Sequence, residues 1–283
     1  MIKILKSGFY TSVQDQGRLG FAQYGVPSSG VMDQYASKFA NQLLGNAKDA
    51  AVLEMTMIGA ELQFLTATRI AIAGADMGAT INGKAVAMFK SIKIHKNDIL
   101  KFRQAKDGFR TYVSVRGGIL APQVLGSRSM LKGLTDDLKL NTGEQLHIEN
   151  ELTLKSAKYA RLKFNGSYLQ TKILDVFKGP EFEKLTPTQV DDLLQSDYQV
   201  SKFNSRMAYQ LQPLIQNDLE PILTGPVLPG TVQLTPSGQL VVLMRDCQTT
   251  GGYPRVLQLT EKAIHILSQK TTADDLMFRL VAL

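Results

Sequence analysis

The sequence is poor in the residues that bind soft metals or form disulfides. It has one cysteine, Cys247, and 3 histidines among 283 residues. A single cysteine excludes an internal disulfide framework, and no cysteine and histidine positions have the spacing of zinc ligands. Cys247 also has no histidine close to it in sequence, so we interpret it as a small structural thiol rather than a nucleophile. We therefore expect no metal site built from these side chains.

Long apolar runs are missing as well. No stretch approaches the roughly 20 apolar residues that span a bilayer, and the N-terminal segment lacks the apolar core of a signal peptide. We therefore expect a cytoplasmic protein with no membrane partner. The pattern Gly-x-x-x-x-Gly-Lys-Ser/Thr is also absent from the sequence, which excludes a P-loop nucleotide site.

Positive charge is in modest excess. Lysine and arginine number 32 against 25 acidic residues, a formal net charge of +7. Such a balance favours anionic small molecules, acidic partners or nucleic acid. No nucleic-acid-binding motif accompanies the charge, and the aromatic residues, 7% of the chain, are not interleaved with basic runs. We therefore expect a small-molecule substrate and no nucleic-acid partner.

The length and the distribution of turns predict two β-rich domains. Single cores seldom grow beyond about 250–300 residues, so a chain of this size holds one large or two smaller domains. We expect two, over residues 1–155 and 156–283. Short strand-like runs, glycine turns and few helices favour β-barrels or sandwiches over a doubly wound α/β sheet.

Several local signals predict individual elements. We expect a helix after Pro27, capped by Ser28 or Ser29 and ended by Gly45. Thr186, Pro187 and Gln189 predict a second helix with a capping box, and a third is expected over Thr260–Gln269. Asn82-Gly83 predicts a hairpin turn. The predicted strands are Leu62–Leu65, Arg69–Ala73, Ile92–Ile94, Ile99–Phe102, Phe109–Val115, Thr171–Phe177, Thr231–Leu234, Leu240–Met244 and Leu276–Val281.

Two glycine-rich clusters in the first half are candidate binding loops. The run Gln14-Asp15-Gln16-Gly17-Arg18 combines a carboxylate, two amides and a guanidinium, which suit an anion, or a turn in which Asp15 pairs with Arg18. Arg116-Gly117-Gly118 follows an apolar strand. Its arginine is placed to hold a carboxylate or phosphate at two points, although Gly-Gly after a strand is also an ordinary turn.

A third, denser cluster lies in the second half. An apolar strand leads into Arg245-Asp246-Cys247-Gln248-Thr249-Thr250, followed by Gly251-Gly252-Tyr253. Nearly every side chain from 245 to 250 can form hydrogen bonds, which a purely structural loop seldom requires. Asp246 is the natural general base of this cluster.

Several short motifs, taken together and in order, resemble one protein family. They are Val13–Arg18, Gly25–Asp33, Asn41–Asn46, Leu53-Glu54, Arg116–Gly118, Gly126–Ser129 and Thr249–Pro254. The chain resembles the KipA or allophanate hydrolase subunit 2 group, whose bacterial members are mostly interpreted as the C component of 5-oxoprolinase. It is also similar to the carboxyltransferase part of urea carboxylase. It departs from the group at Asn204-Ser205-Arg206, where an acidic residue usually precedes the arginine.

The resemblance implies a fold, partners and a reaction. The fold is mainly β, with two cyclophilin-like β-barrel domains and a few short helices. A KipI-like B component and a separate A component of 5-oxoprolinase would join this chain in coupling ATP hydrolysis to the opening of 5-oxo-L-proline to L-glutamate. We expect ATP with magnesium at or near an interface between these proteins. The chain lacks a Met-Lys-Met biotinyl segment, so we expect no biotin attached to it.

On this basis we assign roles to the clustered residues. Arg18 and Arg116 are predicted anion clamps, and Asp15 and Asp246 are predicted proton acceptors or magnesium ligands. The predicted substrate-binding residues are Gln14, Gly17, Gly117, Gly118, Arg206, Gln233, Thr249, Thr250, Gly251, Gly252 and Tyr253. Two alternatives stay open: carboxyl transfer from a separate biotin carrier to urea or a related amide, and non-catalytic binding of a KipI-like inhibitor of a histidine kinase.

Overall fold

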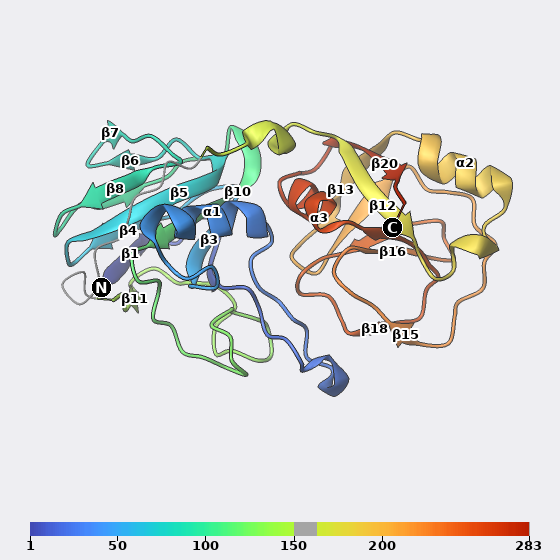
Figure 1. Cartoon of the computed structure of the whole chain (residues 1–283), viewed down its shortest axis with the longest axis horizontal. Coiled ribbons are helices and arrows are strands. Elements are labelled where there is room, and N and C mark those ends of the chain that lie inside the picture. The colour runs from blue at the N-terminus through green and yellow to red at the C-terminus, as the bar shows by residue number, and fades with distance from the viewer. Residues whose placement is uncertain (150–162, 283) are drawn as a thin grey trace. The chain divides into compact units, whose positions relative to one another are not determined.

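The chain folds into two compact units (Figure 1). A computed structural model describes residues 1–149 and 163–282. The first unit comprises Met1–Arg18 and Ser29–Gln170, and the second comprises Leu19–Ser28 and Thr171–Leu283. The domain boundary predicted between residues 155 and 156 lies outside the described residues. Every helix in the described part of the chain falls short of the length and hydrophobicity needed to cross a bilayer.

The first unit is built on two sheets around a common core. The six-stranded sheet has the order β11 (Gln145–Leu146), β1 (Ile2–Lys6), β4 (Glu61–Phe64), β9 (Ile99–Lys101), β6 (Thr80–Ile81) and β7 (Lys84–Ala85). The five-stranded sheet has the order β2 (Tyr10–Gln14), β3 (Val52–Thr56), β10 (Asp107–Val115), β5 (Thr68–Asp76) and β8 (Ser91–Ile94). Side chains alternate between the faces of a strand, so Ile4 and Leu62 of one sheet and Leu53, Ile72 and Val113 of the other share one apolar cluster.

Helix α1 (Gln34–Leu44) packs on the other face of the five-stranded sheet. Its N-cap is Asp33, whose Oδ1 accepts the Ala36 N–H at 3.0 Å, so the prediction of a cap at Ser28 or Ser29 is wrong. The physical reason is tertiary, because the Val31 N–H donates to the carbonyl of Asp15 and holds this segment outside the helix. The predicted stop at Gly45 is confirmed, with φ of 69°.

The second unit is a closed barrel flanked by two helices. Its strands have the order β12 (Ile173–Lys178), β19 (Arg255–Leu259), β16 (Thr231–Leu234), β17 (Leu240–Leu243), β14 (Ala208–Gln212), β13 (Tyr198–Asn204) and β20 (Asp275–Leu280). Strands β12 and β20 run parallel, and the other neighbours are antiparallel. The remaining elements are α2 (Pro187–Gln195), α3 (Glu261–Ser268), the pair β15 (Gly225–Pro226) and β18 (Thr250–Gly251), and 3-10 helices at Ala22–Tyr24, Gly166–Leu169 and Phe182–Lys184.

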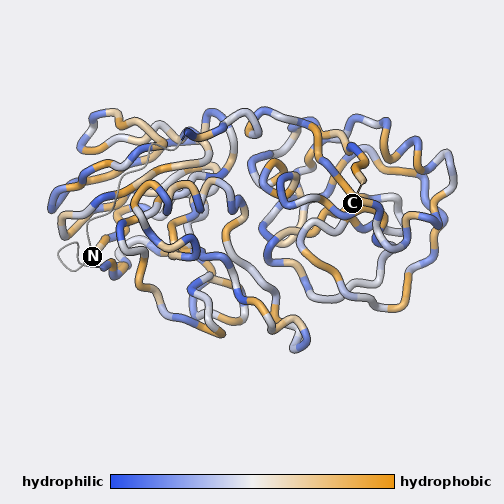
Figure 2. The backbone as a smooth tube through the Cα atoms, viewed as in Figure 1, coloured by the Kyte–Doolittle hydropathy of each residue, from blue (hydrophilic) through white to orange (hydrophobic). Residues whose placement is uncertain are grey.

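The predicted fold class is confirmed: the protein is mainly β, with a barrel and few helices. Hydrophobic and hydrophilic stretches alternate along the backbone of each unit (Figure 2). The hairpin turn has positive φ at Asn82 and Gly83, and Thr186 and Gln189 form the predicted capping box. Within the described residues the closed barrel is that of the second unit, whereas the strands of the first form two separate sheets.

Candidate functional site

The topology of the five-stranded sheet brings three distant segments to one edge. Strands β2 and β10 both pair antiparallel with β3, which lies between them. They therefore run in the same direction and end at the same edge of the sheet, where β3 begins. The register shows this directly, since Gln14 lies opposite Val52 and Val113 lies opposite Leu53. The residues that follow β2 and β10 thus meet the residues that precede β3.

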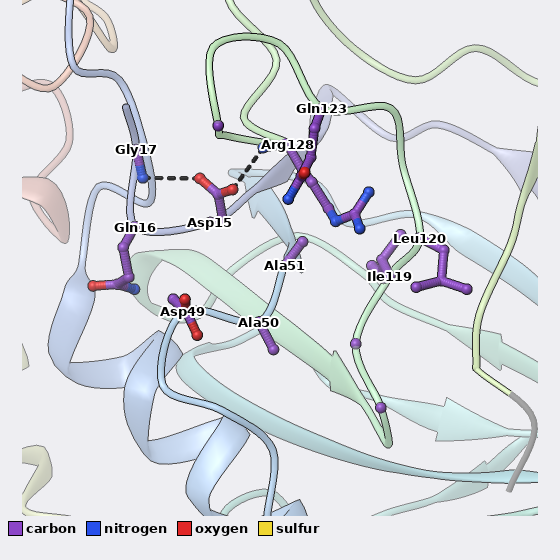
Figure 3. Close-up of a pocket in the computed structure, with 13 residues that line it drawn as sticks. Asp15, Gln16, Gly17, Asp49, Ala50, Ala51, Ile119, Leu120, Gln123 and Arg128 are labelled. Carbon is purple, nitrogen blue, oxygen red and sulfur yellow. Dashed lines mark hydrogen bonds between the residues drawn. The ribbon is translucent and has the colours of Figure 1, made fainter. Parts of the chain in front are cut away.

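A cavity of about 240 Å³ lies at this edge (Figure 3). Its lining comes from the residues after β2, the residues before β3, and the turn and long loop after β10. These residues are Asp15, Gln16, Gly17, Asp49, Ala50, Ala51, Gly117, Gly118, Ile119, Leu120, Gln123, Gly126 and Arg128. Sites for drug-sized ligands typically measure about 300–1,000 Å³. The cavity therefore suits a small metabolite better than a whole nucleotide.

The carboxylate of Asp15 holds two turns of the cavity wall together. Its Oδ1 accepts hydrogen bonds from the Ser127 hydroxyl at 2.6 Å, the Ser129 hydroxyl at 2.7 Å and the Gly17 N–H at 2.8 Å. Its Oδ2 accepts the Arg128 N–H at 2.6 Å. Figure 3 draws the bonds to Gly17 and Arg128. Because both oxygens are engaged and the residue is buried, the geometry favours a positioning role for Asp15.

Two predicted glycines form the other wall of the cavity. Gly117 donates its N–H to Asn46 Oδ1 at 2.8 Å, which ties the turn after β10 to the end of α1. Gly118 has φ of +84°, and a Cβ atom there would lie 3.2 Å from the Cβ of Ala50. A residue with a side chain would therefore be strained at this position and would crowd the cavity.

Three residues predicted for the site are not among the described residues that line this cavity: Arg18, Arg116 and Gln14. Arg18 is buried and donates Nη2 to the Ser129 carbonyl at 2.6 Å. Arg116 is half-buried at the end of β10. Gln14 is buried and donates to the Ser12 hydroxyl and the Met130 carbonyl. The arginine of the cavity is instead Arg128.

Sequence reasoning overlooked two charged residues of the cavity. Arg128 stands in the Gly126–Ser129 motif that supports the family resemblance, so a signal existed, but the motif does not indicate which way its side chain points. Asp49 lies in the connection between α1 and β3, where no sequence pattern distinguishes it from a solvent-exposed loop residue.

In the second unit, Arg206 and Asp246 form a two-point ion pair. Arg206 donates Nε to Oδ2 at 2.8 Å and Nη2 to Oδ1 at 2.9 Å. The Asp246 N–H also donates to the Arg206 carbonyl at 2.9 Å, so the turn after β13 is tied to the turn after β17. The pair occupies both carboxylate oxygens, and this favours positioning over proton transfer.

The other predicted residues of the second unit gather beside β15 and β18. Gln233 is buried in β16 and donates Nε2 to the Tyr253 carbonyl at 3.4 Å. A Cβ atom on Gly251 would lie 2.4 Å from Gln233 Nε2, so only glycine fits there without a shift. The Thr249 carbonyl accepts the Val227 N–H at 3.0 Å. The structure therefore brings Gln233 together with the Thr249–Tyr253 segment, in which the Tyr253 ring is exposed.

Comparison with known proteins identifies the family. The model of the carboxyltransferase domain, subdomains A and B, matches residues 24–280. The chain belongs to this family. The matched range includes residues of both units, so each unit contributes to the carboxyltransferase domain.

Relatives of this carboxyltransferase domain carry two kinds of name. This chain is 34% identical over 278 residues to the C component of 5-oxoprolinase from Escherichia coli, a match that covers 95% of this chain and 87% of that protein. The Haemophilus influenzae protein of the same name is 28% identical over 291 residues, covering 100% of this chain and 92% of that one. The crystal structure of the Kluyveromyces lactis urea carboxylase superposes with a TM-score of 0.89 and 26% identity, and covers 99% of this chain but 27% of that chain.

The side chains of this carboxyltransferase domain do not fit a magnesium site of its own. In the described part of the chain, no three His, Cys, Asp or Glu side chains are grouped so that they could hold a metal ion. The two carboxylates predicted as ligands are engaged: Asp15 by hydroxyl and N–H donors, and Asp246 by Arg206. Neither carboxylate is therefore placed to hold magnesium in this chain.

Proposed function

We propose that this chain is the C component of an ATP-dependent 5-oxoprolinase that converts 5-oxo-L-proline to L-glutamate with a KipI-like B component and an A component. The extent of the match to the E. coli protein supports this proposal, because it covers 95% of this chain and 87% of the relative. By contrast, the match to the urea amidolyase of Lachancea kluyveri, at 40% identity, covers only 45% of this chain, so it supports a reaction on urea less well.

The cavity supports a role in binding and orienting the amide. Opening a resonance-stabilised lactam requires fixed donors near the carbonyl oxygen, where negative charge develops. The turns around the cavity are held by Asp15 and Asn46 through several hydrogen bonds, so its polar groups are fixed before a ligand arrives. ATP with magnesium would bind at or near an interface with the partner proteins, since the cavity is small for a nucleotide.

Reconstitution tests this function. The purified chain is mixed with its KipI-like partner, the A component, 5-oxoproline and magnesium ATP, and released glutamate is measured. We expect glutamate release that needs all three proteins and ATP. Equal release without this chain, or no release from the complete mixture, would contradict the proposal.

Carboxyl transfer to urea or a related amide is the second candidate. The similarity to the K. lactis urea carboxylase, with a TM-score of 0.89, favours it. In that case a separate biotinylated carrier is required, and urea should stimulate ATP turnover in its presence. The same reconstituted mixture, given urea and the carrier in place of 5-oxoproline, distinguishes the two functions.

A further inference from the structure

Two opposite charges line the cavity without neutralising each other. Arg128 donates Nη1 to the carbonyl of Ala121, and its guanidinium has no carboxylate partner among the described residues. Asp49 is exposed, and in the described ranges its carboxylate has neither a hydrogen bond nor an ion pair. Both groups are therefore available to a ligand, unlike the carboxylate of Asp15.

The two charges are held on separate segments of the wall. In Figure 3 the guanidinium of Arg128 and the carboxylate of Asp49 lie apart, with Ala51 between them. The backbone of Arg128 is fixed by its 2.6 Å bond to Asp15, and the adjoining Ser127 and Ser129 bind the same carboxylate. Because its Nη1 also donates to the Ala121 carbonyl, the guanidinium is placed in advance and loses little further freedom when it binds a ligand.

The chemistry of the pair defines a ligand class. A guanidinium binds a carboxylate through two parallel N–H bonds, and a free carboxylate accepts N–H donors. A ligand that satisfies both must carry an anionic group at one end and an amide N–H or an ammonium at the other. The volume of about 240 Å³ restricts it to a small molecule.

We infer that Arg128 and Asp49 determine the specificity of this cavity, with Arg128 binding the carboxylate of a small amide and Asp49 accepting its N–H. This inference rests on the proposed function, because the lactam 5-oxoproline carries both groups. Urea has N–H donors but no anion, and so it leaves Arg128 unused. Asp15 is a positioning residue for Arg128.

Titration calorimetry on the full chain, alone and mixed with its partners, tests the pair. The probes are 5-oxoproline, 2-pyrrolidinone, which is the same lactam without the carboxylate, and urea. The variants are Arg128→Gln, the charge-retaining Arg128→Lys and Asp49→Asn. The matched controls are Arg103→Gln and Asp136→Asn, which change exposed residues of the same unit outside the cavity.

We expect 5-oxoproline to bind the wild type at least tenfold more tightly than 2-pyrrolidinone. Arg128→Gln should weaken 5-oxoproline binding by about 10- to 100-fold and leave 2-pyrrolidinone unchanged, because one charge-assisted pair is lost. Arg128→Lys should retain part of the affinity, since it keeps the charge without the fork. Asp49→Asn should weaken both lactams, and the controls should match the wild type.

Three results would overturn the assignment of Arg128 and Asp49. They are equal affinity for the two lactams, an equal effect of Arg128→Gln on both, and no binding of any probe either alone or with partners. Glutamate release with an unchanged KM in Arg128→Gln would refute this inference alone. Selective lactam binding by a complex that releases no glutamate would refute the proposed function alone.

Discussion

Arg206 and Asp246 form a buried ion pair with two hydrogen bonds, of 2.8 and 2.9 Å, that joins two turns of the second unit. The side chains are 7% and 11% exposed, so a charge left alone there would be poorly solvated. Removing one partner of such a pair typically costs about 3–5 kcal/mol, more than the pair itself contributes. If the role of Asp246 is structural, replacing it should therefore lower stability strongly and turnover only a little.

We expect Asp246→Asn to lower the free energy of unfolding by about 3–5 kcal/mol and to lower turnover of the folded complex less than tenfold. Urea denaturation and reconstituted glutamate release measure the two effects. The double variant Arg206→Gln/Asp246→Asn should be less destabilised than the sum of the single variants. A loss of turnover of about 100-fold or more at native stability would instead establish Asp246 as a proton acceptor.

Asp15→Asn should destabilise the first unit. In asparagine an NH2 group takes the place of one carboxylate oxygen, either the acceptor of the Arg128 N–H or the acceptor of the three donors on Oδ1. In both cases this NH2 group faces a donor and the hydrogen bond is lost. We expect a loss of about 1–3 kcal/mol, measured by chemical denaturation. Asp136→Asn, at an exposed position, serves as the control. A stability equal to that of the wild type would show that the hydrogen bonds of Asp15 do not hold the two turns.

Gly118→Ala should be more destabilising than a matched glycine substitution. Gly118 has φ of +84° and lies against Ala50, whereas Gly143 has φ of +96° and open space around it. The left-handed conformation costs alanine about 1–2 kcal/mol at either position, and the contact with Ala50 adds to the cost at Gly118 alone. Thermal unfolding of the two variants compares them. Equal losses would exclude a steric role for Ala50.

Cys247 should resist alkylation in the native protein. Burial, together with the negative charge of Asp246, raises the pKa of the Cys247 thiol to about 12. The thiolate is the reactive form, so its population at pH 8 is very small. We expect iodoacetamide to label the unfolded chain at least 100-fold faster than the native chain. Rapid native labelling would contradict the structural role of this thiol.

The pair of Glu181 and Arg255 should make stability depend on acid pH. Hydrogen bonds from Arg255 hold the pKa of Glu181 below its ordinary value of 4.5, although burial opposes the shift. A lowered pKa means that the contribution to unfolding free energy is present above pH 4.5 and is lost as pH falls through the folded pKa. Denaturation of wild type and Glu181→Gln at pH 7 and below pH 4 measures it. The difference between the two proteins should shrink at low pH, and a constant difference would contradict the prediction.

Signals that depend on a few neighbouring residues were readable in the sequence. The capping box of Thr186 and Gln189 and the turn at Asn82-Gly83 formed as predicted, because both motifs close their hydrogen bonds or set their dihedral angles within four residues. The cap of α1 was misplaced, because the segment before Asp33 is held by Asp15, which is remote from it in the chain.

The residues of the cavity also divide into those that the sequence indicated and those that only the tertiary structure placed there. The sequence by itself determined a β-rich, glycine-turn protein and pointed to Asp15, Gly17, Gly117 and Gly118 at the cavity. Only the tertiary structure decided that Arg128 lines the cavity while Arg18 is buried against the Ser129 carbonyl, 111 positions away in sequence. A local motif limits which residue types are present, but the direction of a long side chain depends on the hydrogen-bond partners that the fold places around it, such as the Ser129 carbonyl beside Arg18.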